Sequence, residues 1–266
     1  MKTFKILGVI SGLFMAGITA YGQSPTNVKR DVAKGEGKGF AVLELFTSEG
    51  CSSCPPADDL MARLQQEAAG KAIYLLAYHV DYWDRQGWKD TFSNAAYSER
   101  QRQYGEWLNK PQIYTPQVIV NGKAEFIGSE ESTARHAIAK QLNTHSSVEL
   151  SIQAKQENNH LNVQYQVVAA PKGSALVIAV VQKTAHSKVT RGENAGRSLA
   201  HVQIVRKLQI QSLNSKGMGT VRVALPQDFD TQNFEILGLV QNINTGEILG
   251  AASAVRLSKG IPRTAR

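Results

Sequence analysis

Apolar residues follow two different patterns in the two halves of the chain. Up to about residue 143, short unbroken apolar runs alternate with stretches in which apolar residues recur at helical spacing. The runs predict buried strands at 40–47, 72–80, 117–120 and 124–127, the last two joined by an Asn121-Gly122 hairpin turn. The periodic stretches predict helices at 57–69, 92–108 and 132–142. This order of elements is typical of an α/β domain around a small mixed sheet.

From residue 147 onward, single apolar and polar residues alternate, as in Val148, Leu150 and Ile152. Turn sequences rich in glycine and asparagine separate these segments. Later strands are predicted at 175–182, 202–212, 220–225, 234–242 and 247–255. Short strands with regular turns predict a second domain that is all-β and sandwich-like.

The chain is therefore expected to have five parts. They are a signal peptide at 1–22, a flexible lead-in at 23–39, an α/β domain at 40–143, a β-sandwich domain at 147–257 and a basic tail at 258–266. The signal peptide is predicted from two lysines, an uncharged stretch from Ile6 to Ala20, and small residues up to Gly22. A retained membrane anchor is the alternative, but a span needs roughly 20 apolar residues. We expect an exported protein, periplasmic or secreted, without stable membrane insertion.

The formal net charge of +8 is spread thinly along the chain. No basic run carries interleaved aromatic residues, so nucleic acid is not an expected partner.

The chain has only two cysteines, Cys51 and Cys54, between a predicted strand and a predicted helix. A structural bridge over so short a loop adds only about 2 kcal/mol by the chain-entropy estimate. A chain of this size builds a core without such a bridge. We therefore interpret the pair as a redox-active dithiol that needs no cofactor and whose partners are thiols or disulfides of proteins or small molecules.

The two sulfurs are expected to have different roles. A helix N-terminus favours thiolate over thiol, so Cys51 is expected to be the exposed attacking sulfur and Cys54 the resolving one. Pro55 and Pro56 are compatible with a first helical turn. However, Pro55 disfavours helical conformation at Cys54, which would weaken the effect of the helix on the pKa of Cys51.

Thr115-Pro116, at the start of the third strand, is open to two interpretations. A cis bond would leave backbone groups at the strand edge free to pair with a substrate chain, whereas a trans bond is the ordinary case. Spacing alone does not decide between them.

Three stretches together carry a resemblance: Val42–Asp58, His79–Asp84 and Tyr114–Gln117. On these residues the chain resembles the thioredoxin superfamily and, more narrowly, an exported bacterial family catalogued as a domain of unknown function. The resemblance implies a thioredoxin-like α/β domain with a helical insertion, a cis bond at Thr115-Pro116 and no known substrate. The full expectation is such a domain followed by an all-β sandwich-like domain. Asp90-Thr91-Phe92 stands where related sequences are expected to have Asp-Pro-Phe, which affects only the start of the inserted helix.

Glu44 precedes the cysteines on the first predicted strand. A buried carboxylate there could take the proton of Cys54, its pKa raised by burial. The equal alternative is a partly exposed strand residue with a basic partner. The catalytic set expected from the sequence is therefore Cys51, Cys54, Thr115, Pro116 and Glu44.

A metal site is the main competing hypothesis. His79, Asp81 and Asp84 follow the second strand and, with Cys51 and Cys54, could bind Cu(I) or Zn(II). The smallest such set is Cys51, Cys54 and His79. The neighbouring Tyr82 and Trp83 are expected to be rim or core aromatics.

One loop of the second half, Arg191–His201, holds two arginines, a glutamate, an asparagine and a histidine between glycines. It could clamp a peptide, dock against the first domain, or be a solvated loop with internal ion pairs. The sequence thus leaves three functions open: a thiol–disulfide oxidoreductase, a metal carrier using the same cysteines, or a non-catalytic interaction module.

Overall fold

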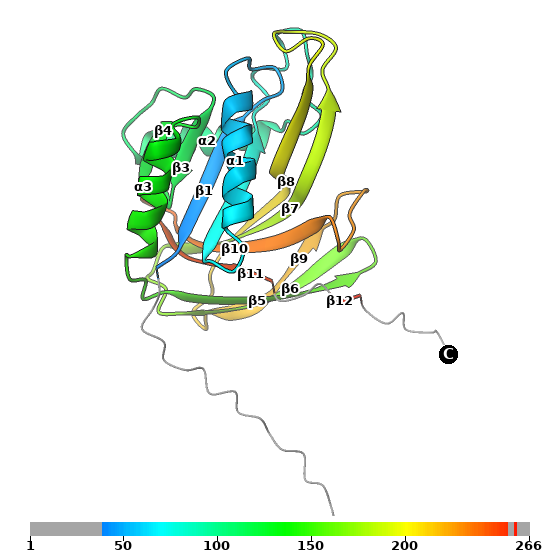
Figure 1. Ribbon diagram of the computed structural model, residues 1–266. Coiled ribbons are helices and arrows are strands. Elements are labelled where there is room, and N and C mark those ends of the chain that lie inside the picture. Colours follow the sequence, from blue (N-terminus) through cyan, green and yellow to red (C-terminus); the bar gives the residue numbers. More distant parts are fainter. Residues whose placement is uncertain (1–38, 255–257, 260–266) are drawn as a thin grey trace, which may run out of the picture. The chain divides into compact units, whose positions relative to one another are not determined.

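The structure is a computed structural model that describes residues 39–254 and 258–259 (Figure 1). Within those residues the chain forms three helices and twelve strands. The helices are α1 (Pro55–Glu67), α2 (Ala95–Trp107) and α3 (Glu131–Leu142). The first strands are β1 (Ala41–Thr47), β2 (Ile73–His79), β3 (Gln117–Val120) and β4 (Ala124–Ile127). The later strands are β5 (Glu149–Glu157), β6 (His160–Val168), β7 (Ser174–Lys188), β8 (Ser198–Ser212), β9 (Met218–Ala224), β10 (Phe234–Asn242), β11 (Ile248–Ser253) and β12 (Ser258–Lys259).

Eight strands form one mixed sheet, in the order β11-β10-β7-β8-β2-β1-β3-β4. Strands β1 and β2 are parallel, and β3 is antiparallel to β1. The two halves of the chain meet where β2 pairs in parallel with β8, through Ala77 and Ile204. The other strands form a second sheet, in the order β12-β5-β6-β9.

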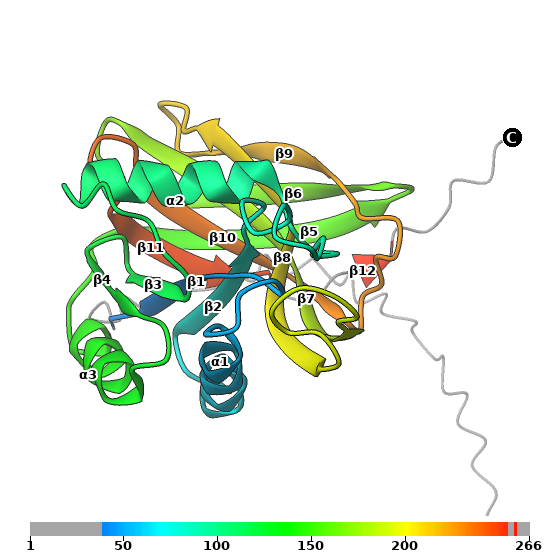
Figure 2. The ribbon, with the colours of Figure 1, turned by 90° about the horizontal axis from the view of Figure 1, so that it is seen from above.

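Strand β1 is buried along its whole length because its two faces pack against different helices. Leu43 and Leu45 face the core that includes α1 and α3. Val42 and Phe46 face the core that includes α2. Figure 2 shows α1 and α3 on one side of β1 and α2 on the other. Successive side chains of a strand point to opposite faces, so an unbroken apolar run is what this position requires.

Strand β7 is also buried on both faces. Ile178 and Val180 pack against the second sheet, together with residues of β5, β6 and β9. Val177 and Ala179 pack on the opposite face, in the same core as residues of β1, β2 and α2. Strands of the second half therefore pack into the same core as β1, β2 and α2, and the second half does not form a separate layered structure.

The expected fold class, an α/β thioredoxin-like domain with a helical insertion followed by an all-β sandwich-like domain, is wrong. The described part of the chain is mostly β, and strands from both halves share the eight-stranded sheet. The physical reason is twofold. Strand β2 does not lie at a sheet edge, because it pairs with β8. Strand β7 has an apolar run that is buried on both faces of the sheet, whereas a strand of a two-sheet sandwich buries only its inner face.

The expected signal peptide at 1–22 and all but the last residue of the lead-in at 23–39 lie outside the described residues. In the expected tail at 258–266, Ser258 and Lys259 pair in parallel with β5. In the described ranges, no helix is both long and apolar enough to cross a membrane.

Candidate functional site

The two cysteines lie on a tight loop between β1 and α1 and form a disulfide bond. Backbone hydrogen bonds shape this loop: Cys51 N–H donates to the Ser48 carbonyl at 3.2 Å, and Cys54 N–H donates to the Cys51 carbonyl at 3.2 Å. Gly50 N–H donates to Ser48 Oγ at 3.1 Å. The loop is thus held in place by its own backbone as well as by the bridge.

Cys54 is the N-cap of α1 and has helical backbone angles, with φ of −78° and ψ of −36°. Its carbonyl accepts from Ala57 N–H at 2.9 Å and from Asp58 N–H at 3.2 Å. Pro55 was expected to disfavour helical backbone angles at Cys54, and this expectation is wrong. The positive end of the helix lies at the disulfide.

Both cysteines are buried in the disulfide form, with Cys51 1% and Cys54 0% exposed. The expectation that Cys51 is an exposed sulfur is wrong for this state. Ser52 and Ser53, between the cysteines, are exposed. One segment that packs against the cysteine loop is the connection between β7 and β8.

This β7–β8 loop, residues 189–197, lies on the cysteine loop. Asn194 is fully buried, and its Nδ2 donates to the carbonyls of Glu49 and Cys51, both at 2.9 Å. Glu193 Oε2 accepts from Ser52 N–H at 3.0 Å, and this hydrogen bonding lowers the pKa of Glu193. Of the three roles open to this loop, the structure shows docking against the first half of the chain.

The loop holding Thr115 and Pro116 also adjoins the cysteines. The Thr115-Pro116 peptide bond is cis, as the resemblance implied. Ser53 Oγ donates to the Thr115 carbonyl at 3.4 Å. Trp83 Nε1 donates to Thr115 Oγ1 at 2.8 Å, which makes this tryptophan part of the rim around the cysteine loop.

Glu44 lies on the other face of the sheet from α1, because it alternates with Leu43 and Leu45 along β1. It is fully buried, and its Oε1 accepts from Arg100 Nε at 2.8 Å. Its Oε2 accepts from the Tyr104 hydroxyl. Both oxygens are therefore engaged on the α2 side, and the basic partner that the sequence left open is Arg100.

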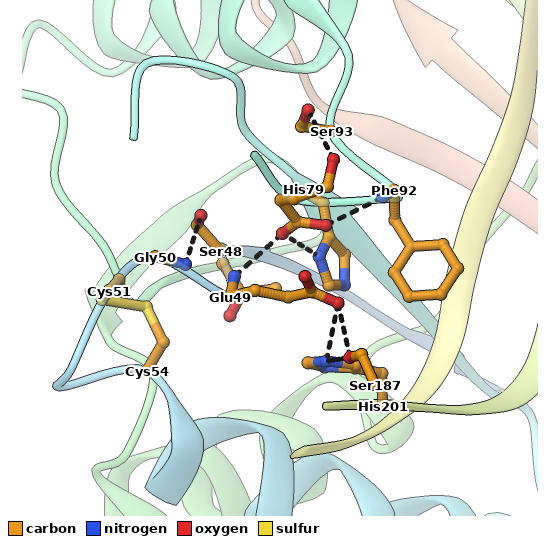
Figure 3. A network of polar contacts seen from close by, with 12 residues as sticks. Ser48, Glu49, Gly50, Cys51, Cys54, His79, Phe92, Ser93, Ser187 and His201 are labelled. Atoms are coloured by element: carbon orange, nitrogen blue, oxygen red, sulfur yellow. Dashed lines mark hydrogen bonds and ion pairs between the residues drawn. A yellow bond between two sulfur atoms is a disulfide. The ribbon is translucent and has the colours of Figure 1, made fainter. Parts of the chain in front are cut away.

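A cluster that sequence analysis missed lies behind the disulfide (Figure 3). Ser187 Oγ donates to Glu49 Oε1 at 2.5 Å and lies 3.2 Å from His201 Nε2. His201 Nδ1 lies 3.5 Å from Asp58 Oδ2, and Thr47 Oγ1 donates to Asp58 Oδ1 at 3.1 Å. An imidazole from β8 is thus held between carboxylates from the cysteine loop and from α1.

The electrostatics of this cluster favour an ionised state. Burial disfavours the charged imidazole, but the nearby carboxylates of Asp58 and Glu49 outweigh it and raise the pKa of His201 to about 9. Burial also opposes ionisation of Glu49, yet hydrogen bonds from His201, Ser187 and Trp88 lower its pKa overall.

His79 contacts Asp90 and not the two cysteines with which the metal hypothesis grouped it. Its Nδ1 lies 2.7 Å from Asp90 Oδ2, and both residues are buried. Burial opposes ionisation of Asp90, but the contact with His79 and hydrogen bonds from the backbone N–H groups of Glu49 and Phe92 together lower the pKa of Asp90. The His79 ring packs edge-on to His201 with centroids 4.8 Å apart.

The geometry does not assemble the alternative metal set. Asp81 accepts from Ser98 Oγ at 2.5 Å and Asp84 from Ser93 Oγ at 2.7 Å, each with its own local partner. Over residues 39–254 and 258–259, no three or more His, Cys, Asp or Glu side chains are grouped so as to hold a metal ion. The two cysteines are bonded to each other.

Comparison with known proteins gives a family and a fold. A family model described as a protein of unknown function (DUF1223) matches residues 42–241. A crystal structure of an Agrobacterium tumefaciens protein is 26% identical, with a TM-score of 0.63, and the match covers 81% of this chain and 93% of that one. The Porphyromonas gingivalis protein HBP35 is 15% identical, with a TM-score of 0.58 over 88% of this chain and 80% of that one, a likeness of fold alone. No curated protein matches the chain.

Proposed function

The chain belongs to the DUF1223 family of proteins of unknown function, and we propose that it is an exported thiol–disulfide oxidoreductase that uses the Cys51/Cys54 couple. The observation that carries the proposal is the disulfide itself, which closes a four-residue loop directly before the first turn of α1. Backbone hydrogen bonds already hold that loop. Because a bridge of this span adds only about 2 kcal/mol to stability, exchange is the better reason for it.

The chemistry is a two-step exchange. An external thiolate attacks Cys51 Sγ, the Cys51–Cys54 bond breaks, and Cys54 leaves with the electron pair. A second external thiolate then attacks the mixed disulfide and releases Cys51. In the opposite direction, the Cys54 thiolate attacks the mixed disulfide at Cys51 and releases the partner thiol. The helix N-terminus stabilises whichever thiolate is present.

We expect access to Cys51 to require displacement of the β7–β8 loop, because Asn194 of this loop is bonded to the Cys51 carbonyl. Ser52 and Ser53 are exposed, so a partner can already contact the cysteine loop at these two residues. The Asn194 and Glu193 hydrogen bonds hold the covering loop in place. Exchange is therefore expected to be slower with bulky protein disulfides than with small thiols unless the partner itself displaces this loop.

Export supports this chemistry, because disulfides persist outside the reducing cytoplasm. It is proposed from the pattern of residues 1–22, with Gln23 as the first residue of the mature protein. The N-terminal sequence of protein recovered from the periplasm or medium tests it. Retention of Met1 in the cytoplasm would contradict export.

Two cysteine variants test the redox function. The reduced protein should exchange with glutathione disulfide and, with dithiothreitol as the electron donor, speed the reduction of insulin, and Cys51→Ser should abolish both activities. Cys54→Ser should accumulate a mixed disulfide at Cys51, because the resolving sulfur is gone. A wild-type protein whose dithiol exchanges with neither substrate would contradict the proposal, as would stoichiometric copper or zinc in anaerobically purified protein.

A further inference from the structure

One imidazole in the core lies within reach of two carboxylates that flank the disulfide in sequence. His201 is 2% exposed, and its Nε2 lies 3.6 Å from Glu49 Oε1. Its Nδ1 has no hydrogen-bond partner, although Asp58 Oδ2 lies 3.5 Å away. A buried ring nitrogen without a partner is uncommon and calls for an explanation.

The carboxylates connect this imidazole to the cysteines. Glu49 lies two residues before Cys51, and Figure 3 shows its side chain extending from the cysteine loop toward His201 and Ser187. Asp58 lies one helical turn after Cys54, on the same face of α1, because residues four apart are neighbours on a helix. The cluster therefore lies beside the loop on which the disulfide opens and closes.

We propose that His201, acting through Asp58 with Glu49 as its counter-ion, is the proton relay of the Cys51/Cys54 couple. This rests on the redox function proposed above. When an external thiolate bonds to Cys51 and the disulfide breaks, the Cys54 sulfur takes the electron pair. Asp58 carries a proton from the His201 imidazolium to that sulfur, which leaves a neutral imidazole that recovers a proton from solvent. When the disulfide closes, the His201 imidazolium first releases its proton to solvent, and the neutral imidazole then takes the proton of the Cys54 thiol through Asp58.

The pKa values suit this transfer. The carboxylates raise the pKa of His201 to about 9, and an ordinary thiol has a pKa of about 8.5. A donor and an acceptor with similar pKa values exchange a proton with little free-energy cost in either direction. Glu44 is less suited to this role, because it lies on the other face of the sheet from α1 and is paired there with Arg100 and Tyr104.

Groups from several elements face His201 and must be counted in any titration. They are Glu49 on the cysteine loop, Asp58 on α1, Ser187 on β7, His79 on β2 and the ring of Phe92, with Asp90 behind His79 and Arg206 over Phe92. The two carboxylates come from segments next to the cysteines, and Ser187 connects the imidazole to one of them, Glu49.

A titration of the wild-type protein tests the relay without any variant. The His201 ring signal is followed by NMR against pH in the disulfide form and in the fully reduced form. A Cys54 thiolate next to the cluster adds negative charge, so the apparent pKa of His201 should be higher in the reduced form. Exposed His136 on α3 serves as the internal control and should titrate identically in both forms. Equal values for His201 in the two forms would overturn the relay.

Two matched carboxylate variants test it kinetically. The rate of disulfide opening by dithiothreitol is measured from pH 5 to 10 for Asp58→Asn and for Asp59→Asn, its exposed neighbour on α1, after circular dichroism confirms that each is folded. Asp58→Asn should slow opening by about 100-fold or more at neutral pH and change the pH profile. Asp59→Asn should keep the wild-type profile, because this exposed carboxylate does not face His201. The reverse result, or unchanged profiles in both, would overturn the relay, whereas wild-type cysteines that do not exchange at all would overturn the redox function itself.

Discussion

The side-chain amide of Asn194 donates a hydrogen bond to the main-chain carbonyl of Cys51 at 2.9 Å, although 143 positions separate them in sequence. The same amide also donates to the Glu49 carbonyl. A single buried side chain thus ties the loop that covers the disulfide to the loop that carries it. Access to Cys51 is therefore a property of the contact between the two halves of the chain.

Removing this amide should expose the disulfide. Asn194→Ala leaves two buried carbonyls without their donor, which costs about 1–3 kcal/mol and favours displacement of the β7–β8 loop. We expect reduction by dithiothreitol to become faster, by roughly tenfold for each 1.4 kcal/mol that the closed loop loses. The measurement is the rate of disulfide reduction under excess dithiothreitol. Asn143→Ala, which removes an amide at the exposed end of α3, is the control, and equal rates for the two variants would refute the covering role.

Stability should depend on pH through His201. Its pKa is about 9 in the folded protein against an ordinary value of 6.5, so folding favours the imidazolium. That stabilisation is complete below pH 6.5 and is lost as the pH rises through 9. The free energy of unfolding, measured in urea at several pH values, should fall across this window. His201→Gln should remove most of this decline, and a decline of equal size in the variant would assign the effect to other groups.

The Glu44–Arg100 pair should be structural. Replacing one partner leaves an uncompensated buried charge, so Arg100→Leu is expected to lower the free energy of unfolding by about 3–5 kcal/mol. The double variant Glu44→Leu with Arg100→Leu should recover much of that loss, because neither charge remains. Urea unfolding of the two single variants and the double variant gives the coupling. Additive losses would show that the two residues do not act as a pair.

Gly122 joins the two halves at a point of close approach. Its φ is +66°, and an added Cβ would lie 2.0 Å from the Gly246 carbonyl oxygen. Gly70 has a similar φ of +73° but open space around it. Gly70→Ala should cost about 1–2 kcal/mol, the ordinary cost of left-handed backbone, whereas Gly122→Ala should cost about 3 kcal/mol or more. Thermal unfolding of both variants measures the difference, and equal losses would argue against the close contact.

A fragment of residues 40–143 should not fold cooperatively. It retains β1 to β4 and the three helices but lacks the partners of Leu76 and Tyr78 that come from β7, β8 and β10. It also exposes the edge of β2 that pairs with β8. Circular dichroism and amide hydrogen exchange of the fragment should show weak protection. A sharp melting transition close to that of the whole chain would contradict the shared core.

Much of the local structure follows from the sequence. The strands at 117–120 and 124–127 have the predicted bounds, because Pro116 precedes the first and an Asn-Gly turn separates them. The helix predicted at 132–142 begins one residue earlier. The Cys51–Cys54 bridge is local too, since three positions along a tight loop bring two sulfurs together. These features depend on hydrogen bonds and side-chain periodicity that act over a few residues.

The assembly of the sheet could not be predicted in this way. Alternation in the later strands indicated a separate sandwich, yet the unbroken apolar run at 175–181 was a sign that β7 is buried on both faces. Only the tertiary structure decides which distant strand covers a free edge. That choice depends on the total apolar surface removed from water, which no local pattern contains.

Some features of the candidate site follow from the sequence, and others depend on the tertiary structure. The sequence by itself determined the dithiol and its place before a helix, whereas Thr115, 62 positions from Ser53, adjoins the cysteine loop only in the tertiary structure. The tertiary structure decided that Cys51 is covered, that Glu44 is paired with Arg100, and that His201 lies between two carboxylates near the bridge. The reason is physical: the first group of features arises from contacts between residues close in the chain, whereas the second exists only because β8 pairs with β2 and carries its side chains to the cysteine loop.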